Sequence, residues 1–102
     1  MNNRLDALRV MVASNPGDTF ARYGLAMEYV KTGHLQEAVD EFSKVLELNA
    51  NYPPAYFHGG QALEKLGRLD EARALYQQGI EVTTAMGDVH TRSELQAALD
   101  IL

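Results

Sequence analysis

The chain of 102 residues carries a net charge of −5 and is 46% apolar and 23% charged. This length fits a single domain, and the apolar share is large enough to favour a folded chain over a disordered one. Nucleic-acid binding requires clustered Lys and Arg, whereas the nine basic residues here are scattered among fourteen acidic ones, so we expect no nucleic acid partner.

The sequence contains no cysteine, so disulfides and thiol chemistry are excluded. No apolar run approaches the roughly 18 residues of a membrane-spanning helix. The first residues also lack the charged head and apolar core of a signal peptide. We therefore expect a cytoplasmic protein with no membrane partner.

Apolar residues recur at helical spacing along the chain, which predicts an all-α protein. The expected helices, in chain order, span about 3–14, 19–32, 35–49, 54–66, 69–86 and 91–102. Proline can stop one helix and begin the next, and glycine can take the left-handed conformation that ends a helix. Such residues separate the expected helices (Pro16, Gly33, Pro53, Gly67 and Gly87).

The two terminal helices differ from the four between them. Helix 3–14 is apolar around more than one face, because Val10 and Met11 lie beside the stripe that contains Leu8. Helix 91–102 begins with Thr91 and Glu94, which are spaced as a capping box. We expect this last helix to act as a lid that covers the open face of the unit before it.

A repeated unit appears when the chain is compared with itself at the offset that places Gly33 on Gly67. Residues 33–38 then fall on 67–72 with Gly, Leu, Glu and Ala in common, and Phe42 falls on Tyr76. Identity is concentrated at small and apolar positions, as expected of a unit that packs in the same way each time.

The same phase extends back into the first helix. Leu8 falls on Phe42 and Met11 falls on Val45, so the chain starts midway through a unit, at its second helix. One residue departs from this pattern, because Arg4 stands where the other units have alanine.

The units resemble the tetratricopeptide repeat, through Leu25, Ala26 and Tyr29 in one helix and the Gly-x-Leu-x-Glu-Ala pattern of residues 33–38 in the next. The resemblance implies a right-handed superhelix of antiparallel helix pairs. It divides one domain, 1–102, into a half repeat (3–18), repeat 1 (19–52), repeat 2 (53–86) and a C-terminal capping helix (88–102).

Some positions depart from the usual pattern of the family. An aromatic residue is common early in the first helix of a unit, and this position holds Arg22 in repeat 1 and Tyr56 in repeat 2. Gly59 stands where the family often has leucine, directly before Gly60. We interpret these two glycines as the close approach of a neighbouring helix, with a hinge as the alternative.

The resemblance also implies that the first helices of the units line a concave groove that binds ligand segments. By position, the groove residues would be Phe20, Tyr23, Met27 and Lys31 from one helix and Phe57, His58, Gln61 and Lys65 from the next. Spacing supports this independently, because Phe20, Tyr23 and Met27 belong to a second apolar stripe on helix 19–32. Tyr23, Met27 and His58 stand where some family members hold a terminal carboxylate, so we expect an apolar or aromatic ligand segment instead.

No constellation of residues predicts catalysis. The three histidines are far apart in the sequence (His34, His58 and His90), which does not favour a metal site, and no phosphate-binding loop or catalytic triad is present. Adjacent acidic pairs such as Asp40-Glu41 are expected to be solvated surface. We therefore predict a non-catalytic protein–protein interaction scaffold without cofactors. A self-associating module, joined through helix 3–14, or a fragment of a longer array is the alternative.

Overall fold

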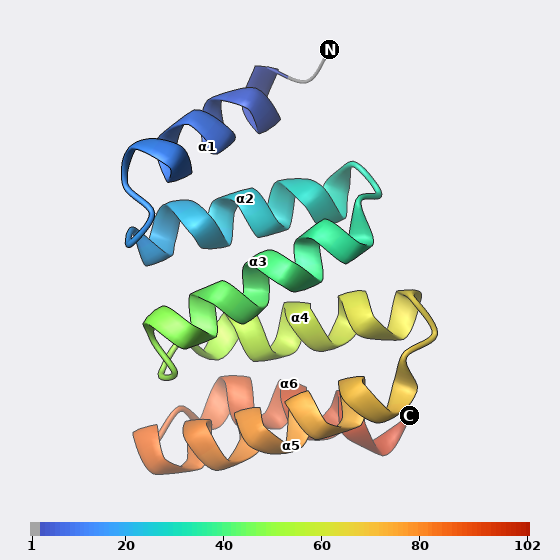
Figure 1. The fold of residues 1–102 in the computed structure, drawn as a ribbon. Helices are drawn as coiled ribbons and strands as arrows, with labels where there is room; N and C mark the ends of the chain where they lie inside the picture. Colours follow the sequence, from blue (N-terminus) through green and yellow to red (C-terminus); the bar gives the residue numbers. More distant parts are fainter. Residues whose placement is uncertain (1–2) are drawn as a thin grey trace.

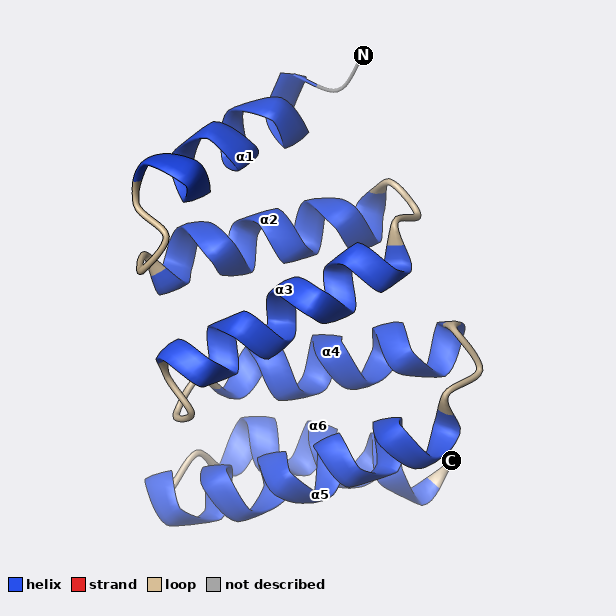
Figure 2. Cartoon of the chain, in the orientation of Figure 1, coloured by secondary structure: helices blue, strands red, loops and turns tan. Residues whose placement is uncertain are grey.

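The computed structural model describes residues 3–102, which fold into helices joined by short turns (Figure 1). The helices are α1 (Asn3–Ser14), α2 (Thr19–Lys31), α3 (Leu35–Leu48), α4 (Pro53–Lys65), α5 (Leu69–Met86) and α6 (Val89–Asp100). No strand occurs in this range (Figure 2). The predicted all-α fold is therefore confirmed, and the helix bounds agree with those expected to within two residues.

The start of α6 is the largest difference. Its N-cap is Asp88, whose side-chain Oδ1 accepts a hydrogen bond from the N–H of Thr91 at 3.1 Å. The capping box that was expected to begin at Thr91 is therefore wrong, because Thr91 already lies inside the first turn. Asp and Thr are both good N-cap residues, and their sequence spacing does not decide which one caps.

The helices pair as α2 with α3 and α4 with α5, and the turns within these two pairs have the same backbone geometry. Gly33 and Gly67 have positive φ angles of 80° and 77°, where a glycine avoids the strain that a side chain would cause. The N–H of the following residue then bonds back to the preceding helix, from His34 to Tyr29 O and from Arg68 to Leu63 O. Neither His34 nor Arg68 caps the next helix with its side chain, so these backbone hydrogen bonds take the place of a side-chain cap.

The turns between helix pairs are held by side chains at equivalent positions of the two repeats. Arg22 donates two hydrogen bonds to Pro16 O, at 3.0 and 3.2 Å. Tyr56 donates one to Ala50 O, at 2.7 Å. Each donor reaches a carbonyl six residues earlier, so the two residues have the same role in the two repeats although one is charged and the other aromatic.

Each helix packs against the next, and the helices form two rows. The inner row is α2, α4 and α6, in which α2 contacts α4 and α4 contacts α6. The outer row is α1, α3 and α5, whose backbones stay apart from one another. In Figure 1, α6 lies behind α5, and α1 lies at the far end of the array. The helix α3 packs between α2 and α4, whereas α1 packs against α2 alone in the part of the chain that the structure describes.

The core runs continuously between the two rows. Ala38 and Ala72 are fully buried where paired helices approach, and Phe42 and Tyr76 are 1% and 0% exposed. The prediction that both rings point into the shared interior is confirmed. A Cβ atom added to Gly60 would lie 2.1 Å from the Tyr76 ring, so the predicted close approach of a neighbouring helix explains this glycine.

Candidate functional site

A hollow of about 680 Å³ lies between α1 and α2. The four groove residues predicted on α2 line it together: Phe20, Tyr23, Met27 and Lys31. Side chains of α1 supply the second wall: Arg4, Leu8 and Met11. Helix periodicity placed the α2 residues on one face and left open whether a terminal helix covers that face; α1 lies beside it.

One end of the hollow is apolar and exposed. Phe20 lies in the first turn of α2 and has 76% of its surface exposed, and Met11 on the opposite wall has 51% exposed. Large apolar side chains in this state gain free energy when a partner covers them, at about 25 cal/mol per Å² of apolar surface. This end of the groove is therefore open, and neither terminal helix covers Phe20.

The other end of the hollow is charged. Arg4 Nε lies 3.2 Å from Glu28 Oε2, and the Glu28 side chain is only 7% exposed while that of Arg4 is 69% exposed. Lys31 lies in the last turn of α2 on the same lining. Because Arg4 and Lys31 outnumber Glu28, this end has a net positive charge.

Tyr23 links the hollow to the groove residues predicted on α4. Its ring centroid lies 6.3 Å from that of His58 and 5.2 Å from that of Tyr52. The His58 ring in turn lies 5.2 Å from that of Phe57. The structure thus brings Phe57 and His58 next to the α2 residues. It also adds Tyr52, which the sequence pattern did not single out.

The remaining predicted groove residues, Gln61 and Lys65, are exposed further along α4 and do not line the hollow. Gln61 acts on the groove through His58. Burial lowers the pKa of His58 below its ordinary value, while the charge of Glu94 on α6 and a hydrogen bond with Gln61 partly raise it. His58 is therefore neutral at pH 7, and α6, which carries Glu94, packs against the same helix α4.

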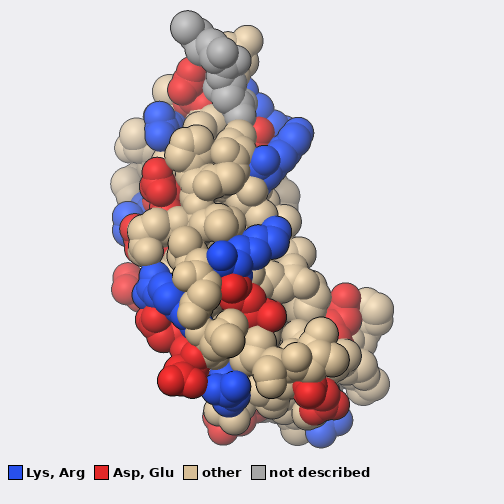
Figure 3. Space-filling view, turned by 90° about the vertical axis from the view of Figure 1, so that its right-hand side faces the viewer, with Lys and Arg blue, Asp and Glu red and all other residues tan. Residues whose placement is uncertain are grey.

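Charges of both signs are interspersed on one face of the molecule. The face in Figure 3 carries acidic and basic side chains among uncharged ones, without a large area of one sign. Such a surface does not have the clustered positive charge that nucleic-acid binding requires.

Two family models match the chain, one described as a TPR repeat over residues 26–67 and one as a tetratricopeptide repeat over residues 53–85. A tetratricopeptide repeat domain protein from Salinibacter ruber, known from a crystal structure, is 39% identical with a TM-score of 0.75. The match covers 80% of this chain and 91% of that one. The chain belongs to the tetratricopeptide repeat family. A protein of Methanocaldococcus jannaschii without a described function is also 37% identical over 60 residues, which are 59% of this chain and 70% of that protein.

The fold extends over nearly the whole of this tetratricopeptide repeat protein. PcrH, solved in complex with the chaperone binding region of PopD, superposes with a TM-score of 0.89 over 95% of this chain and 74% of PcrH. Sequence identity is 18%, so the likeness concerns the fold. Tetratricopeptide repeats form a generally non-catalytic scaffold for protein interactions, which is the class of function that was predicted.

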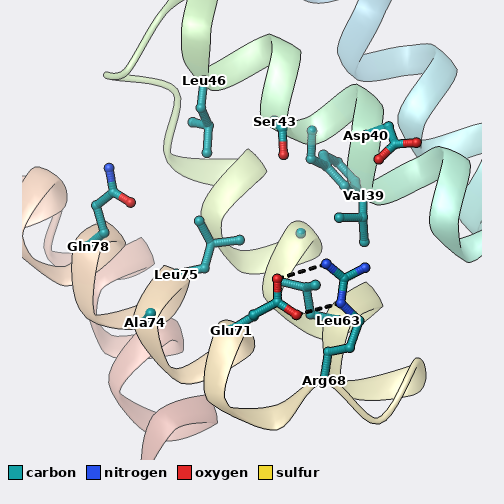
Figure 4. A pocket seen from close by; sticks show the side chains of 12 residues that line it. Val39, Asp40, Ser43, Leu46, Leu63, Arg68, Glu71, Ala74, Leu75 and Gln78 are labelled. Carbon is teal, nitrogen blue, oxygen red and sulfur yellow. Dashed lines mark hydrogen bonds and ion pairs between the residues drawn. The ribbon is translucent and has the colours of Figure 1, made fainter.

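A second hollow, of about 370 Å³, opens on the outer row between α3 and α5 (Figure 4). Gly59 is one of its lining residues, and a Cβ atom added there would lie 3.0 Å from Leu75 of α5. At its edge Arg68 holds Glu71 through two hydrogen bonds, of 2.5 and 2.8 Å, and this contact lowers the pKa of Glu71. No pattern in the sequence indicated this hollow.

The acidic residues are not all solvated as expected. Asp40 is exposed, but Glu41 lies 2.9 Å from Arg22, and both side chains are nearly buried, with 12% and 11% exposed. The expectation for Glu41 is therefore wrong, because its neighbour on another helix shields it. Within residues 3–102 no three acidic or histidine side chains are arranged to hold a metal ion. In the same range no helix has the length and apolar character needed to cross a membrane.

Proposed function

We propose that this protein binds a segment of a partner protein along its inner row of helices, and that the main contact is in the hollow between α1 and α2. The observation that carries the proposal is the concentration of exposed apolar surface there, with Phe20 76% and Met11 51% exposed on facing walls. Aromatic and methionine side chains provide large and adaptable contact area for a protein ligand.

The wider family context supports a protein ligand. One protein of the same fold, PcrH, was solved with the chaperone binding region of PopD. In the present chain Tyr23, Phe57 and His58 extend the apolar surface from the hollow toward α4. A bound segment with apolar or aromatic side chains matches this lining better than a terminal carboxylate does.

Phe20 is the best residue with which to test the proposal, because its exposure makes it unimportant for folding. Tyr23 is less suitable, since its ring also contacts Phe42 in the core. Peptides selected from a random library against the purified chain should be enriched in apolar and aromatic residues. We expect Phe20→Ala to weaken their binding about tenfold, which corresponds to about 1.4 kcal/mol, as measured by fluorescence anisotropy.

The matched control is Leu48→Ala, which truncates an apolar residue on the outer row that is 47% exposed. It should leave peptide affinity unchanged, and both variants should melt within a few degrees of the wild type. Equal binding by wild type and Phe20→Ala would contradict the proposal.

Self-association through α1 is a second candidate. The observation that favours it is Val10, which is 65% exposed on the side of α1 that does not line the hollow. Sedimentation over a concentration series tests this. A strict monomer at about 100 µM, a concentration at which weak dimers of micromolar affinity form, would exclude it.

A further inference from the structure

The helix α1 has the sequence phase and the position of an outer helix, but among residues 3–102 it packs against one inner helix, where the other outer helices pack against two. The helix α3 packs against α2 and α4, and α5 packs against α4 and α6. Within residues 3–102, α1 packs against α2 only. In the described residues, no helix lies against α1 in the way that α2 lies against α3.

The side chains at equivalent positions show which face of α1 is open. Ala38, Phe42 and Val45 of α3 are 0%, 1% and 0% exposed, and Phe42 lies between Tyr23 of α2 and Gly59 of α4. Their counterparts one repeat earlier are Arg4, Leu8 and Met11. Leu8 is 9% exposed and Met11 51%, and the Arg4 side chain is 69% exposed.

These same three residues form the α1 wall of the hollow. The opposite wall is the side of α2 that carries Phe20, Gly24 and Met27. The hollow therefore lies where repetition of the fold would place another inner helix, packed against α1 as its pair and against α2 as its neighbour in the inner row.

The charges specify the direction and the chemistry of such a helix. An inner helix runs antiparallel to its outer partner, so its last turn would lie next to Arg4, at the start of α1, and next to Lys31, at the end of α2. The C-terminal end of a helix carries a partial negative charge that favours nearby cations. An acidic side chain in that turn would add a direct ion pair.

We propose that the hollow between α1 and α2 is the seat of an amphipathic helix of a partner protein, which covers Leu8, Met11 and Phe20 with its apolar face and presents an acidic last turn to Arg4 and Lys31. The helix is about as long as the inner helices α2 and α4, which have 13 residues each. This inference rests on the proposed function and adds that the ligand is helical. A groove that binds an extended segment would satisfy the proposed function but not this inference.

The probe is a library of fluorescein-labelled, alanine-based helical peptides in which the positions of one face vary among Ala, Leu, Met and Phe, and the last turn carries either Glu or Lys. The strongest binder should have Glu in the last turn and a dissociation constant below about 1 mM. Its helical circular dichroism signal should increase on binding. A version with proline in the middle, which breaks the helix, should bind at least tenfold more weakly.

Two matched variants test whether the helical peptide binds in the hollow between α1 and α2. Met11→Glu places a charge in the hollow and should weaken binding at least tenfold. Val10→Glu makes the same change at the next residue of α1, which is exposed but does not line the hollow, and affinity should stay within twofold. Arg4→Glu should reverse the preference, so that the Lys-ended peptide binds more tightly than the Glu-ended one.

The results separate this inference from the proposed function. If no helical peptide binds, if the proline version binds equally well, or if Met11→Glu and Val10→Glu behave alike, the helical seat is wrong. Library-selected peptides that still depend on Phe20 would then leave the proposed function standing. If no peptide of either kind binds through Phe20, both are wrong.

Discussion

Gly60 lies against the ring of Tyr76, whereas its neighbour Gly59 faces the hollow between α3 and α5. A Cβ atom on Gly60 would lie 2.1 Å from the ring, so either the ring or α4 would have to move. On Gly59 the nearest atom would be the flexible end of Leu75, at 3.0 Å. The same substitution therefore meets a rigid, fully buried ring at one position and a movable side chain at the other.

We expect Gly60→Ala to lower the free energy of unfolding by about 1–3 kcal/mol, the usual cost of overpacking a core. Gly59→Ala should change it by less than about 1 kcal/mol, because the gain in helix propensity offsets the displacement of Leu75. Urea denaturation of the two variants measures the difference. Equal losses would show that Gly59 is as tightly confined as Gly60.

His58 makes the stability of the fold depend on pH. Burial lowers the pKa of His58 in the folded chain below its ordinary value of 6.5, so the unfolded chain takes up a proton first as the pH falls. Its contribution to stability is complete above pH 6.5 and is lost as the pH falls below that value. Glu94 opposes this loss without cancelling it.

The urea midpoint should therefore fall more between about pH 7.5 and pH 5.5, on either side of the ordinary histidine pKa, in the wild type than in His58→Gln. His34 and His90 are present in both proteins, so their effects cancel in the comparison. Parallel curves for the two proteins would mean that His58 stays as accessible to protons as in the unfolded chain.

At the scale of the helices that the structure describes, from residue 3 to residue 102, α1 has the fewest neighbours, because it packs against α2 alone while α4 packs against α2, α3, α5 and α6. Opening free energies within a folded protein follow such local contacts. Amides of α1 should thus exchange with deuterium much faster than those of α4, with an opening free energy below that of global unfolding. Hydrogen exchange followed by NMR measures both helices in one sample. Uniform protection would mean that the chain opens only as a whole.

Helix periodicity was sufficient to predict the helices, since each one shows its apolar stripe in its own sequence. It could not predict contacts that depend on how two helices face each other. Tyr23 was correctly placed with the α2 stripe, but its contact with Tyr52 comes from a turn between helices. Glu41 was expected in water because its position on α3 does not reveal that Arg22 of α2 reaches it.

For the molecule as a whole, the repeat offset was the most informative property of the sequence. It placed Phe42 and Tyr76 in one continuous interior and identified α1 as an outer helix. It did not predict the start of α6, because α5 has 18 residues where α3 has 14. The period is therefore lost at the end of the array, where the family match also stops, at residue 85.

The hydrogen bonds that Arg22 and Tyr56 donate to the preceding turns have a consequence for building longer arrays from this chain. Glu41 faces Arg22, and Leu75 takes the place of Glu41 in the second repeat. Tyrosine at position 22 alone would leave the shielded Glu41 carboxylate with only the exposed Lys44, 3.7 Å away. Arginine at position 56 alone would introduce a cation without that carboxylate. A chimaera that exchanges residues between the repeats must therefore move positions 22 and 41 together, as Arg with Glu, and positions 56 and 75 together, as Tyr with Leu.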